Sequence, residues 1–167
     1  MRILAISGSL QATSSNLVLL QTAVALAPAG VEVVLSDLLR DLPQFNPDLE
    51  TTAPLPVVQT WRRAIAESDG LLIASPEYGF SLPGALKNGI DWVIGTGELE
   101  RKIVAITAAV RDRERGRRGL KALSDTLNAV SAVIVADAPI VRGPAFESEI
   151  SAMLAALVAE VARRRRD

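Results

Sequence analysis

The sequence contains no cysteine and no histidine, and its aromatic residues are two tryptophans, one tyrosine and three phenylalanines. Without cysteine there are no disulfides and no thiolate nucleophiles. Without either residue type, the commonest zinc sites and Ser-His-Asp catalysis are also excluded. Any chemistry must therefore come from carboxylates, hydroxyls, lysines, arginines, backbone amides or a bound cofactor.

Charge of neither sign is in excess, because 18 basic and 19 acidic residues leave a formal net charge of −1. This balance gives no reason to expect a nucleic-acid partner. The first apolar run ends at Ser7, which is too short for a signal peptide or a membrane span, so we expect a cytoplasmic protein without a membrane partner. We expect a single domain over residues 1–167, since 49% of the residues are hydrophobic.

Short apolar runs alternate with helical patterns along the whole chain. The expected strands are 3–7, 31–35, 70–74, 103–108 and 132–136, and the expected helices are 16–26, 57–68, 83–94, 120–130 and 146–164. This alternation predicts an α/β fold in which helices cover both faces of a parallel sheet, in Rossmann-type or flavodoxin-type order. The first helix is expected to bury Leu17, Leu20, Val24 and Ala27.

Ligands of such sheets bind beyond the carboxyl ends of the strands, where the loops after the first, third and fourth expected strands meet. The first of these loops, from Gly8 to Asn16, reads Gly-Ser-Leu-Gln-Ala-Thr-Ser-Ser-Asn. It lacks the dinucleotide and nucleoside-triphosphate glycine patterns. Neutral donors before a helix N-terminus suit a phosphate monoester such as that of flavin mononucleotide (FMN), with Ser9, Ser14, Ser15 and Asn16 as the donors. The alternative is that Ser14, Ser15 or Asn16 is only the N-cap of the helix.

The second loop lies in the segment 75–92, which reads Ser-Pro-Glu-Tyr-Gly-Phe-Ser-Leu-Pro-Gly-Ala-Leu-Lys-Asn-Gly-Ile-Asp-Trp. Gly79 permits a positive φ, and the amides of 77–79 are expected to face the polar edge of a flat ligand against which Tyr78 lies. We expect Trp92 to be a core residue, and Lys87 and Asp91 to form an ion pair within the helix.

This segment resembles the Pro-Glu-Tyr-Asn-x-Ser-x-Pro-Gly-x-Leu-Lys-Asn-x-Ile-Asp-Trp motif of the NADPH-dependent FMN reductase family, a flavodoxin-like group that includes quinone, chromate and azo-dye reductases. The matching residues are Pro76, Glu77, Tyr78, Ser81, Pro83, Gly84, Leu86, Lys87, Asn88, Ile90, Asp91 and Trp92. The first loop is similar to the family's Gly-Ser-Leu-Arg-x-x-Ser-x-Asn loop. The resemblance implies a flavodoxin-like three-layer sandwich with a five-stranded parallel sheet in the order 2-1-3-4-5.

The same resemblance implies FMN as cofactor and NADPH or NADH as reductant. It assigns Ser9, Ser14 and Asn16 to the FMN phosphate and the loop of Pro76–Gly79 to the ribityl chain and ring. The complete predicted cofactor-binding set is Ser9, Gln11, Ser14, Ser15, Asn16, Pro76, Glu77, Tyr78, Gly79, Thr107 and Ala108. Gln11 replaces the family's arginine, so we expect weaker phosphate binding and easy loss of flavin. Gly79 replaces the usual asparagine but keeps the backbone amide.

The third loop begins at Thr107 and Ala108 and continues into the charged stretch 111–118. This stretch is either a solvated loop or a site where Arg111, Arg115, Arg117 or Arg118 meets the phosphates of NADPH. Arg163–Arg166 are expected to end a solvated helix. The segment 42–47 is expected to cover the flavin or to contact a second subunit, because the family members are commonly dimers or tetramers.

We expect an oxidoreductase that passes electrons from NAD(P)H through FMN to a quinone-like or other small acceptor by a ping-pong route. No catalytic side chain and no metal are expected, because the cofactor carries the chemistry. A second possibility is an FMN reductase that uses free FMN as a substrate and supplies a partner enzyme. The sequence also allows an electron carrier, which the near-neutral charge disfavours, and a binding module without turnover.

Overall fold

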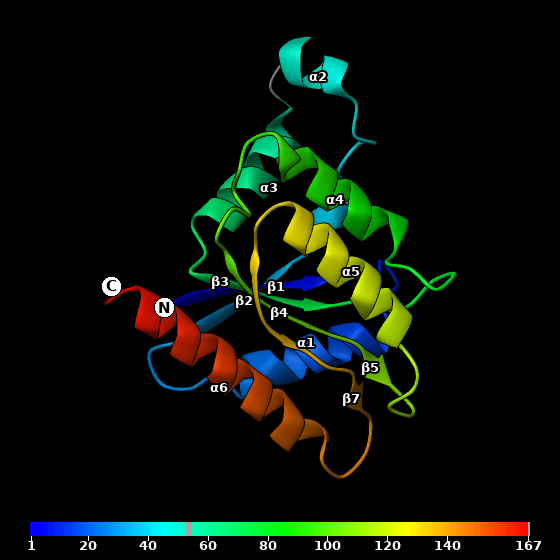
Figure 1. Ribbon diagram of the computed structural model, residues 1–167, viewed down its shortest axis with the longest axis vertical. Coiled ribbons are helices and arrows are strands. Elements are labelled where there is room, and N and C mark those ends of the chain that lie inside the picture. Colours follow the sequence, from blue (N-terminus) through cyan, green and yellow to red (C-terminus); the bar gives the residue numbers. More distant parts are fainter. Residues whose placement is uncertain (53–54, 167) are drawn as a thin grey trace.

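The computed structural model describes residues 1–52 and 55–166 (Figure 1). The helices are α1 (Ser15–Ala25), α2 (Pro47–Thr52), α3 (Pro56–Ala66), α4 (Gly84–Ile94), α5 (Arg117–Ala129) and α6 (Phe146–Arg164), with the 3-10 helix η1 (Leu38–Arg40). The strands are β1 (Arg2–Ser7), β2 (Glu32–Ser36), β3 (Gly70–Ala74), β4 (Ile103–Thr107), β5 (Ala109–Val110), β6 (Val133–Asp137) and β7 (Ile140–Val141). In this part of the chain, no helix combines the length and the apolar character that crossing a bilayer requires.

Five strands form a parallel sheet in the order β2-β1-β3-β4-β6. Since β6 is the fifth of the expected strands, this confirms the predicted order 2-1-3-4-5. Register pairs such as Ser7 with Ala74, and Ala74 with Thr107, bring the carboxyl ends of the strands to one edge. Beyond that edge β5 and β7 form a separate parallel ladder, which the sequence did not predict because two-residue strands carry no periodic pattern.

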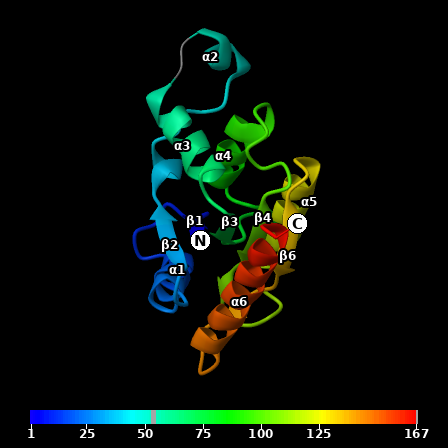
Figure 2. The same cartoon turned by 90° about the vertical axis from the view of Figure 1, so that its left-hand side faces the viewer.

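Helices cover both faces of the sheet, giving the predicted three layers (Figures 1 and 2). Ile3 and Ala5 of β1 pack into the core under α1 and α6, whereas Leu4 and Ile6 pack into the core under α3, α4 and α5. This alternation explains why the strands read as continuous apolar runs, because a parallel sheet buries both of its faces.

The buried face of α1 differs from the prediction. Its buried residues are Asn16, Leu19, Leu20 and Ala23, whereas Val24 of the predicted face is 39% exposed. The helix is apolar on most of its sides, so its hydrophobic pattern does not select one face. The side chain of Asn16 contributes to that selection, because its Oδ1 accepts a hydrogen bond from the N–H of Ala109 at 2.9 Å.

The segment 42–47 packs on α4 of its own chain. The amide of Asn88 donates to Pro43 O at 2.9 Å and its Oδ1 accepts from Phe45 N at 2.7 Å. Trp92 is 1% exposed, as predicted for a core residue, and its indole N–H also donates to Pro43 O, at 2.8 Å. The predicted ion pair is present too, with Lys87 Nζ and Asp91 Oδ1 2.5 Å apart. Part of the family motif therefore holds a neighbouring segment in place.

Candidate functional site

The first loop leaves the sheet at Gly8, whose N–H donates to Ala74 O at 2.8 Å. A Cβ at this position would lie 2.8 Å from Ser75 Oγ, so the loop can turn so close to β3 only with glycine. Ser14 is the N-cap of α1, and its hydroxyl accepts from Asn16 N at 3.2 Å. Ser14 therefore caps the helix, while among the described residues its hydroxyl hydrogen has no acceptor, so capping does not exclude the predicted phosphate role.

Within the described residues, the amides of Ser15 and Leu17 donate to no protein group. They lie at the positive end of α1, where an anion is favoured. Ser9 is buried at the start of the loop, and its hydroxyl accepts from Gln11 N at 3.3 Å. The side chain of Gln11 is exposed and donates to Thr13 Oγ1 at 3.3 Å. The loop therefore presents neutral donors, as its sequence indicates.

The second loop ends in a two-residue hairpin. Tyr78 and Ser81 exchange both backbone hydrogen bonds at 3.0 Å, while Gly79 and Phe80 between them have φ values of +57° and +62°. This pair of positive φ values is typical of a type I′ turn, and it is strained at Phe80 because a side chain is present. The hairpin holds the rings of Tyr78 and Phe80 in solvent, at 55% and 65% exposure.

One expectation about this loop is wrong in part. The amide of Tyr78 donates to Ser81 O, so it is not available to a ligand. The amides of Glu77 and Gly79, by contrast, donate to no group among the residues that the structure covers. Sequence patterns do not reveal this difference, since it follows from the closure of the hairpin.

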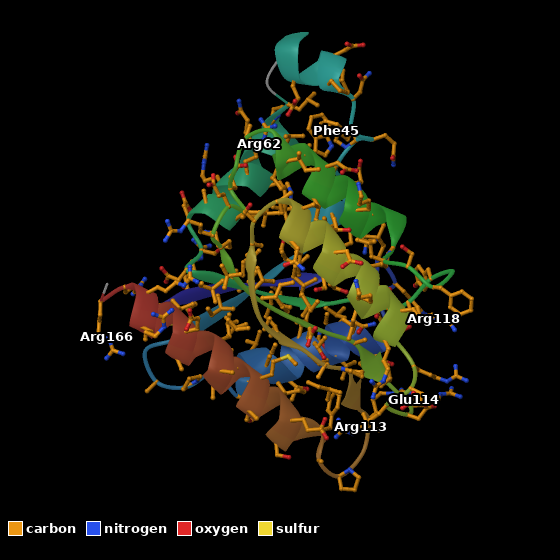
Figure 3. All side chains as sticks on the ribbon, viewed as in Figure 1. Phe45, Arg62, Arg113, Glu114, Arg118 and Arg166 are labelled. Atoms are coloured by element: carbon orange, nitrogen blue, oxygen red, sulfur yellow. The ribbon has the colours of Figure 1, made fainter. Side chains whose placement is uncertain are left out.

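Glu77 holds the second loop against the start of α5. Its Oε2 accepts from Arg118 N at 3.0 Å and from Gly119 N at 2.9 Å. Figure 3 shows Arg118 at the start of α5. A Cβ at Gly119 would lie 3.0 Å from the Cα and the Cβ of Glu77, so glycine permits this close approach. The guanidinium of Arg118 also lies 4.1 Å from the centre of the Phe80 ring.

The third loop runs from Ala108 through β5 into α5, and most of its charges form ion pairs, within the loop or with α6. Arg113 contacts Glu149 at 2.6 Å, and the Arg115–Asp112 and Arg117–Glu114 contacts span 3.3 and 3.6 Å. Figure 3 places Arg113, Glu114 and Arg118 at the end of the molecule where the strands stop. This pairing agrees with a solvated loop for 113–117.

A cavity of about 360 Å³ between Arg113, Arg117 and Asp137 borders the third loop and contains none of the predicted cofactor-binding residues. Two further cavities at the carboxyl edge are lined by residues of the predicted set. The larger, of about 290 Å³, is lined by Asn16, Pro76, Glu77 and Ala108 of the predicted set, and also by Arg111, Arg115 and Arg142. The smaller, of about 80 Å³, brings Ser9 and Gln11 beside Arg40 of η1. Arg40 and Arg142 were missed in the sequence, because only the fold brings them to these loops.

The remaining predicted residues are placed differently. Ser15 begins α1, and Tyr78 and Gly79 are exposed on the hairpin. Thr107 is fully buried and its hydroxyl donates to Ala138 O at 2.8 Å. The side chain of Thr107 therefore joins the end of β4 to the segment after β6 and lines neither of these two cavities.

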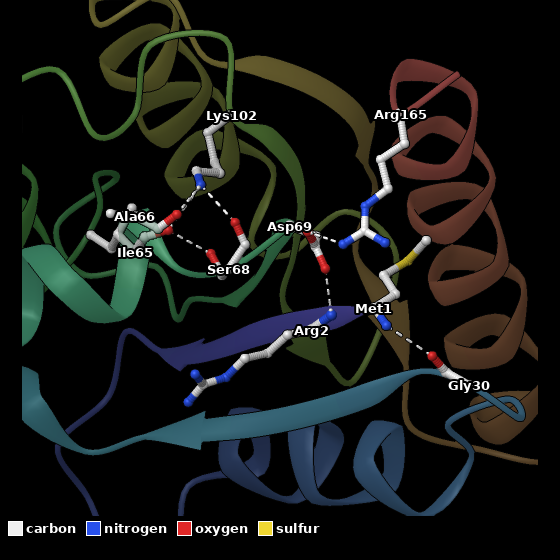
Figure 4. A network of polar contacts seen from close by, with 9 residues as sticks. All are labelled: Met1, Arg2, Gly30, Ile65, Ala66, Ser68, Asp69, Lys102 and Arg165. Carbon is white, nitrogen blue, oxygen red and sulfur yellow. Dashed lines mark hydrogen bonds and ion pairs between the residues drawn. The ribbon is translucent and has the colours of Figure 1, made fainter. Parts of the chain in front are cut away.

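The groups with clearly shifted pKa values are Asp69, Lys102 and Glu160, which lie toward the opposite edge of the sheet, near the end of α6. Figure 4 shows Asp69 and Lys102. Burial lowers the pKa of Lys102, whose ammonium donates to Ile65 O at 2.9 Å in the last turn of α3 and to Ser68 O at 2.7 Å just after it. Hydrogen bonds from Arg163, and then from Arg164, lower the pKa of Glu160 to about 2. These contacts stabilise the fold and lie away from the three loops.

Comparison with known proteins matches residues 1–158 to the sequence model of the NADPH-dependent FMN reductases. The chain belongs to the NADPH-dependent FMN reductase family. The family motif within the segment 75–92 supplies the second loop and most of α4. The family resemblance of the sequence is thereby confirmed.

Two curated relatives illustrate the similarity. An NAD(P)H-dependent FMN reductase of Pseudomonas aeruginosa is 37% identical over 118 residues, which are 71% of this chain and 62% of the relative. A quinone reductase of Escherichia coli K12 is 34% identical over 94 residues, or 56% and 50% of the two chains. The matched part of this chain thus spans about half to three fifths of the length of these FMN reductase family relatives.

Solved structures share the fold. The flavoenzyme NAD(P)H:(acceptor) oxidoreductase FerB of Paracoccus denitrificans superimposes with a TM-score of 0.75 at 22% identity, over 95% of this chain and 97% of its own. An oxidoreductase of Corynebacterium diphtheriae gives 0.72 at 22% identity over 98% of both chains. The arrangement of layers is therefore shared with proteins whose sequences have diverged widely.

Proposed function

We propose that the protein is an NAD(P)H-dependent flavin oxidoreductase that binds FMN and passes electrons to a quinone-like or other small acceptor. The observation that carries this proposal is that unpartnered amides follow the neighbouring parallel strands β1 and β3 in a member of the FMN reductase family. They are the amides of Ser15 and Leu17 after β1 and those of Glu77 and Gly79 after β3. Among the described residues these amides have no protein acceptor, and they suit a ligand with a phosphate at one end and polar ring atoms at the other.

The residues present fit FMN. Ser9, Gln11, Ser14, Ser15 and Asn16 would hold the phosphate through neutral donors at the start of α1. Pro76, Glu77, Tyr78, Gly79 and Ala108 would hold the ribityl chain and the ring, and the small side chain of Ala108 allows close approach. Thr107, which is part of the predicted set, would act through the backbone of its loop because its hydroxyl is engaged.

When bound, FMN would accept a hydride from NAD(P)H and pass two electrons to the acceptor. For a quinone, the balance is one NAD(P)H and one proton consumed, and one NAD(P)⁺ and one hydroquinone formed. The amides of Glu77 and Gly79 would stabilise negative charge on the ring edge. We propose a ping-pong order, in which NAD(P)⁺ leaves before the acceptor binds on the same exposed face.

A second candidate is an enzyme that reduces free FMN for a partner protein. Gln11 favours it, because its exposed amide contacts Thr13 and brings no charge to the phosphate loop. Cytoplasmic location, a homodimer or homotetramer, and the absence of nucleic-acid and membrane partners remain predictions from the sequence.

A spectroscopic and kinetic experiment tests the proposal. The purified protein is scanned in the visible range with and without added FMN, and oxidation of NADPH and NADH is then followed with a quinone as acceptor. Turnover by protein that retains yellow flavin supports the first function, and turnover only with excess free FMN supports the second. Binding without turnover leaves a carrier or a binding module, while no spectral change at millimolar FMN refutes flavin binding.

A further inference from the structure

The first loop, from Gly8 to Asn16, contains no lysine or arginine, yet the fold places the side chain of Arg40 against it. Arg40 is the last residue of η1, which follows β2, and β2 pairs with β1 beside the loop. A guanidinium N–H of Arg40 donates to Leu10 O at 3.0 Å. The register of two neighbouring strands thus delivers a charge that the loop itself lacks.

We propose that Arg40 is the residue that recognises the phosphate dianion of the flavin, and that it makes the site select FMN over riboflavin. This inference rests on the proposed function. Arg40 lines the same cavity of about 80 Å³ as Ser9 and Gln11, so its guanidinium lies beside the predicted phosphate donors. In the described part of the chain, its side chain forms no ion pair and donates only to Leu10 O.

The chemistry of the side chain supports this role. A guanidinium carries five N–H donors in a fixed plane, so one contact with Leu10 O leaves donors for phosphate oxygens. The bond to Leu10 O also limits the freedom of the side chain before a ligand binds, which lowers the entropic cost of binding. A hydrogen bond between charged groups is stronger than one from the neutral loop donors.

Asp37 lines the same cavity, and replacing it should change the affinity for FMN in the opposite direction to replacing Arg40. It precedes η1 but its side chain makes no capping hydrogen bond, so Asp37→Asn should leave η1 intact. Removing this negative charge lowers the repulsion of a phosphate dianion. Asp37→Asn should therefore strengthen FMN binding by a few-fold, while Arg40→Gln weakens it.

The experiment measures the Kd of FMN and of riboflavin by fluorescence titration at two salt concentrations. Arg40→Gln keeps an amide donor for Leu10 O but removes the charge. It should raise the Kd of FMN about tenfold and leave that of riboflavin within about twofold. The salt dependence of FMN binding should fall in the same variant. The matched control is Arg63→Gln, since Arg63 is an exposed arginine in the last turn of α3, at the other edge of the sheet.

Each outcome decides a separate point. Wild-type protein that binds neither flavin refutes the proposed function and this inference with it. If the wild type binds FMN but Arg40→Gln matches Arg63→Gln, the inference alone is wrong. An equal loss of FMN and riboflavin would show that Arg40 only holds the loop, which also overturns it. If Arg40→Gln fails to fold by circular dichroism, Asp37→Asn and Gln11→Arg replace it, and both must tighten FMN binding without affecting riboflavin.

Discussion

Among single residues, Glu77 joins two parts of the site. Arg117 and Arg118 occupy the first turn of α5, where positive charge is unfavourable. The carboxylate of Glu77 compensates for this by accepting the amides of Arg118 and Gly119. This contact explains why α5 begins at Arg117 although the sequence predicts a start at Leu120.

Glu77→Ala should therefore destabilise the protein by about 1–2 kcal/mol, because it removes a charged helix cap. Glu77→Gln should cost less, since an amide oxygen still accepts one hydrogen bond. Urea denaturation measures both, with Glu32→Ala on the exposed edge strand as control. A Glu77→Ala midpoint equal to that of the control would contradict the capping role.

Gly119→Ala separates stability from binding. Alanine favours helix by about 1 kcal/mol over glycine, but its Cβ would press on Glu77 at 3.0 Å and shift the second loop by a few tenths of an ångström. We expect near-wild-type stability by thermal denaturation and a several-fold higher Kd for FMN. Unchanged FMN affinity would show that the position of Glu77 does not matter for binding.

Among the helices and loops, the family motif divides between binding and architecture. Its first part forms the hairpin at the carboxyl edge, and its second part forms α4, which fixes the segment 42–47 through Asn88 and Trp92. The edge-to-face contact of Phe45 with Trp92, at 5.2 Å between ring centres, adds to this attachment.

Asn88→Ala removes both hydrogen bonds of a buried amide and leaves Phe45 N unpartnered. It should destabilise the fold by about 2 kcal/mol, as measured by urea denaturation. The affinity for FMN should stay within about twofold, because Asn88 lines neither of the two cavities beside the loops. A large loss of affinity with unchanged stability would place Asn88 in the binding site instead.

The arginines of the third loop lead to a prediction about the preference for NADPH over NADH. Arg111 lines the cavity of about 290 Å³ beside Asn16 and Glu77, whereas Arg117 pairs with Glu114 and Arg118 lies over Phe80. If NADPH phosphates bind here, Arg111→Gln should raise the KM for NADPH about fivefold and that for NADH much less. Replacing Arg117 and Arg118 by alanine is the comparison, and steady-state kinetics with both nucleotides is the measurement. Equal effects on the two nucleotides would exclude this role for Arg111.

Across the whole molecule, the two edges of the sheet have different roles. The carboxyl edge carries the predicted binding loops and the cavities beside them, while the amino edge carries the polar contacts in Figure 4, which join α3, β1 and α6. Asp69 Oδ2 accepts from Arg2 N at 2.6 Å, and its other oxygen pairs with Arg165 of the tail after α6. The basic run 163–166 is thus a helix end that joins α6 to the sheet.

This edge predicts a pH dependence of stability. Burial alone would raise the pKa of Asp69, but the hydrogen bonds from Arg2 and Arg165 bring it below its ordinary value of 3.8. The ionised carboxyl therefore stabilises the fold above that value, and the contribution is lost as the pH falls through the lower, folded-state pKa. Asp69→Asn should be less stable than wild type at pH 7, and the difference should shrink below about pH 4. A difference that stays constant to pH 2 would contradict this account.

The amino-acid sequence alone predicted the five strands of the main sheet and the loops that meet at one edge. It also limited the strand order to the Rossmann or the flavodoxin type. Parallel strands are buried on both faces, so their apolar runs stand out in the sequence. Loop positions follow from the alternation of strand and helix, and the motif of the second loop identified the family. The short pair β5–β7 and the buried face of α1 did not follow, because neither has a distinctive local pattern.

Which side chains and amides lie next to the binding loops was decided only by the tertiary structure. Arg40 reaches Leu10, Glu77 reaches Gly119, and Asn16 reaches Ala109 through the pairing and packing of strands that are distant in the sequence. Within the described residues, hydrogen-bond closure of the hairpin likewise leaves the amides of Glu77 and Gly79 open and engages that of Tyr78. Such contacts depend on register and packing between elements, whereas local patterns report only the periodicity within one element.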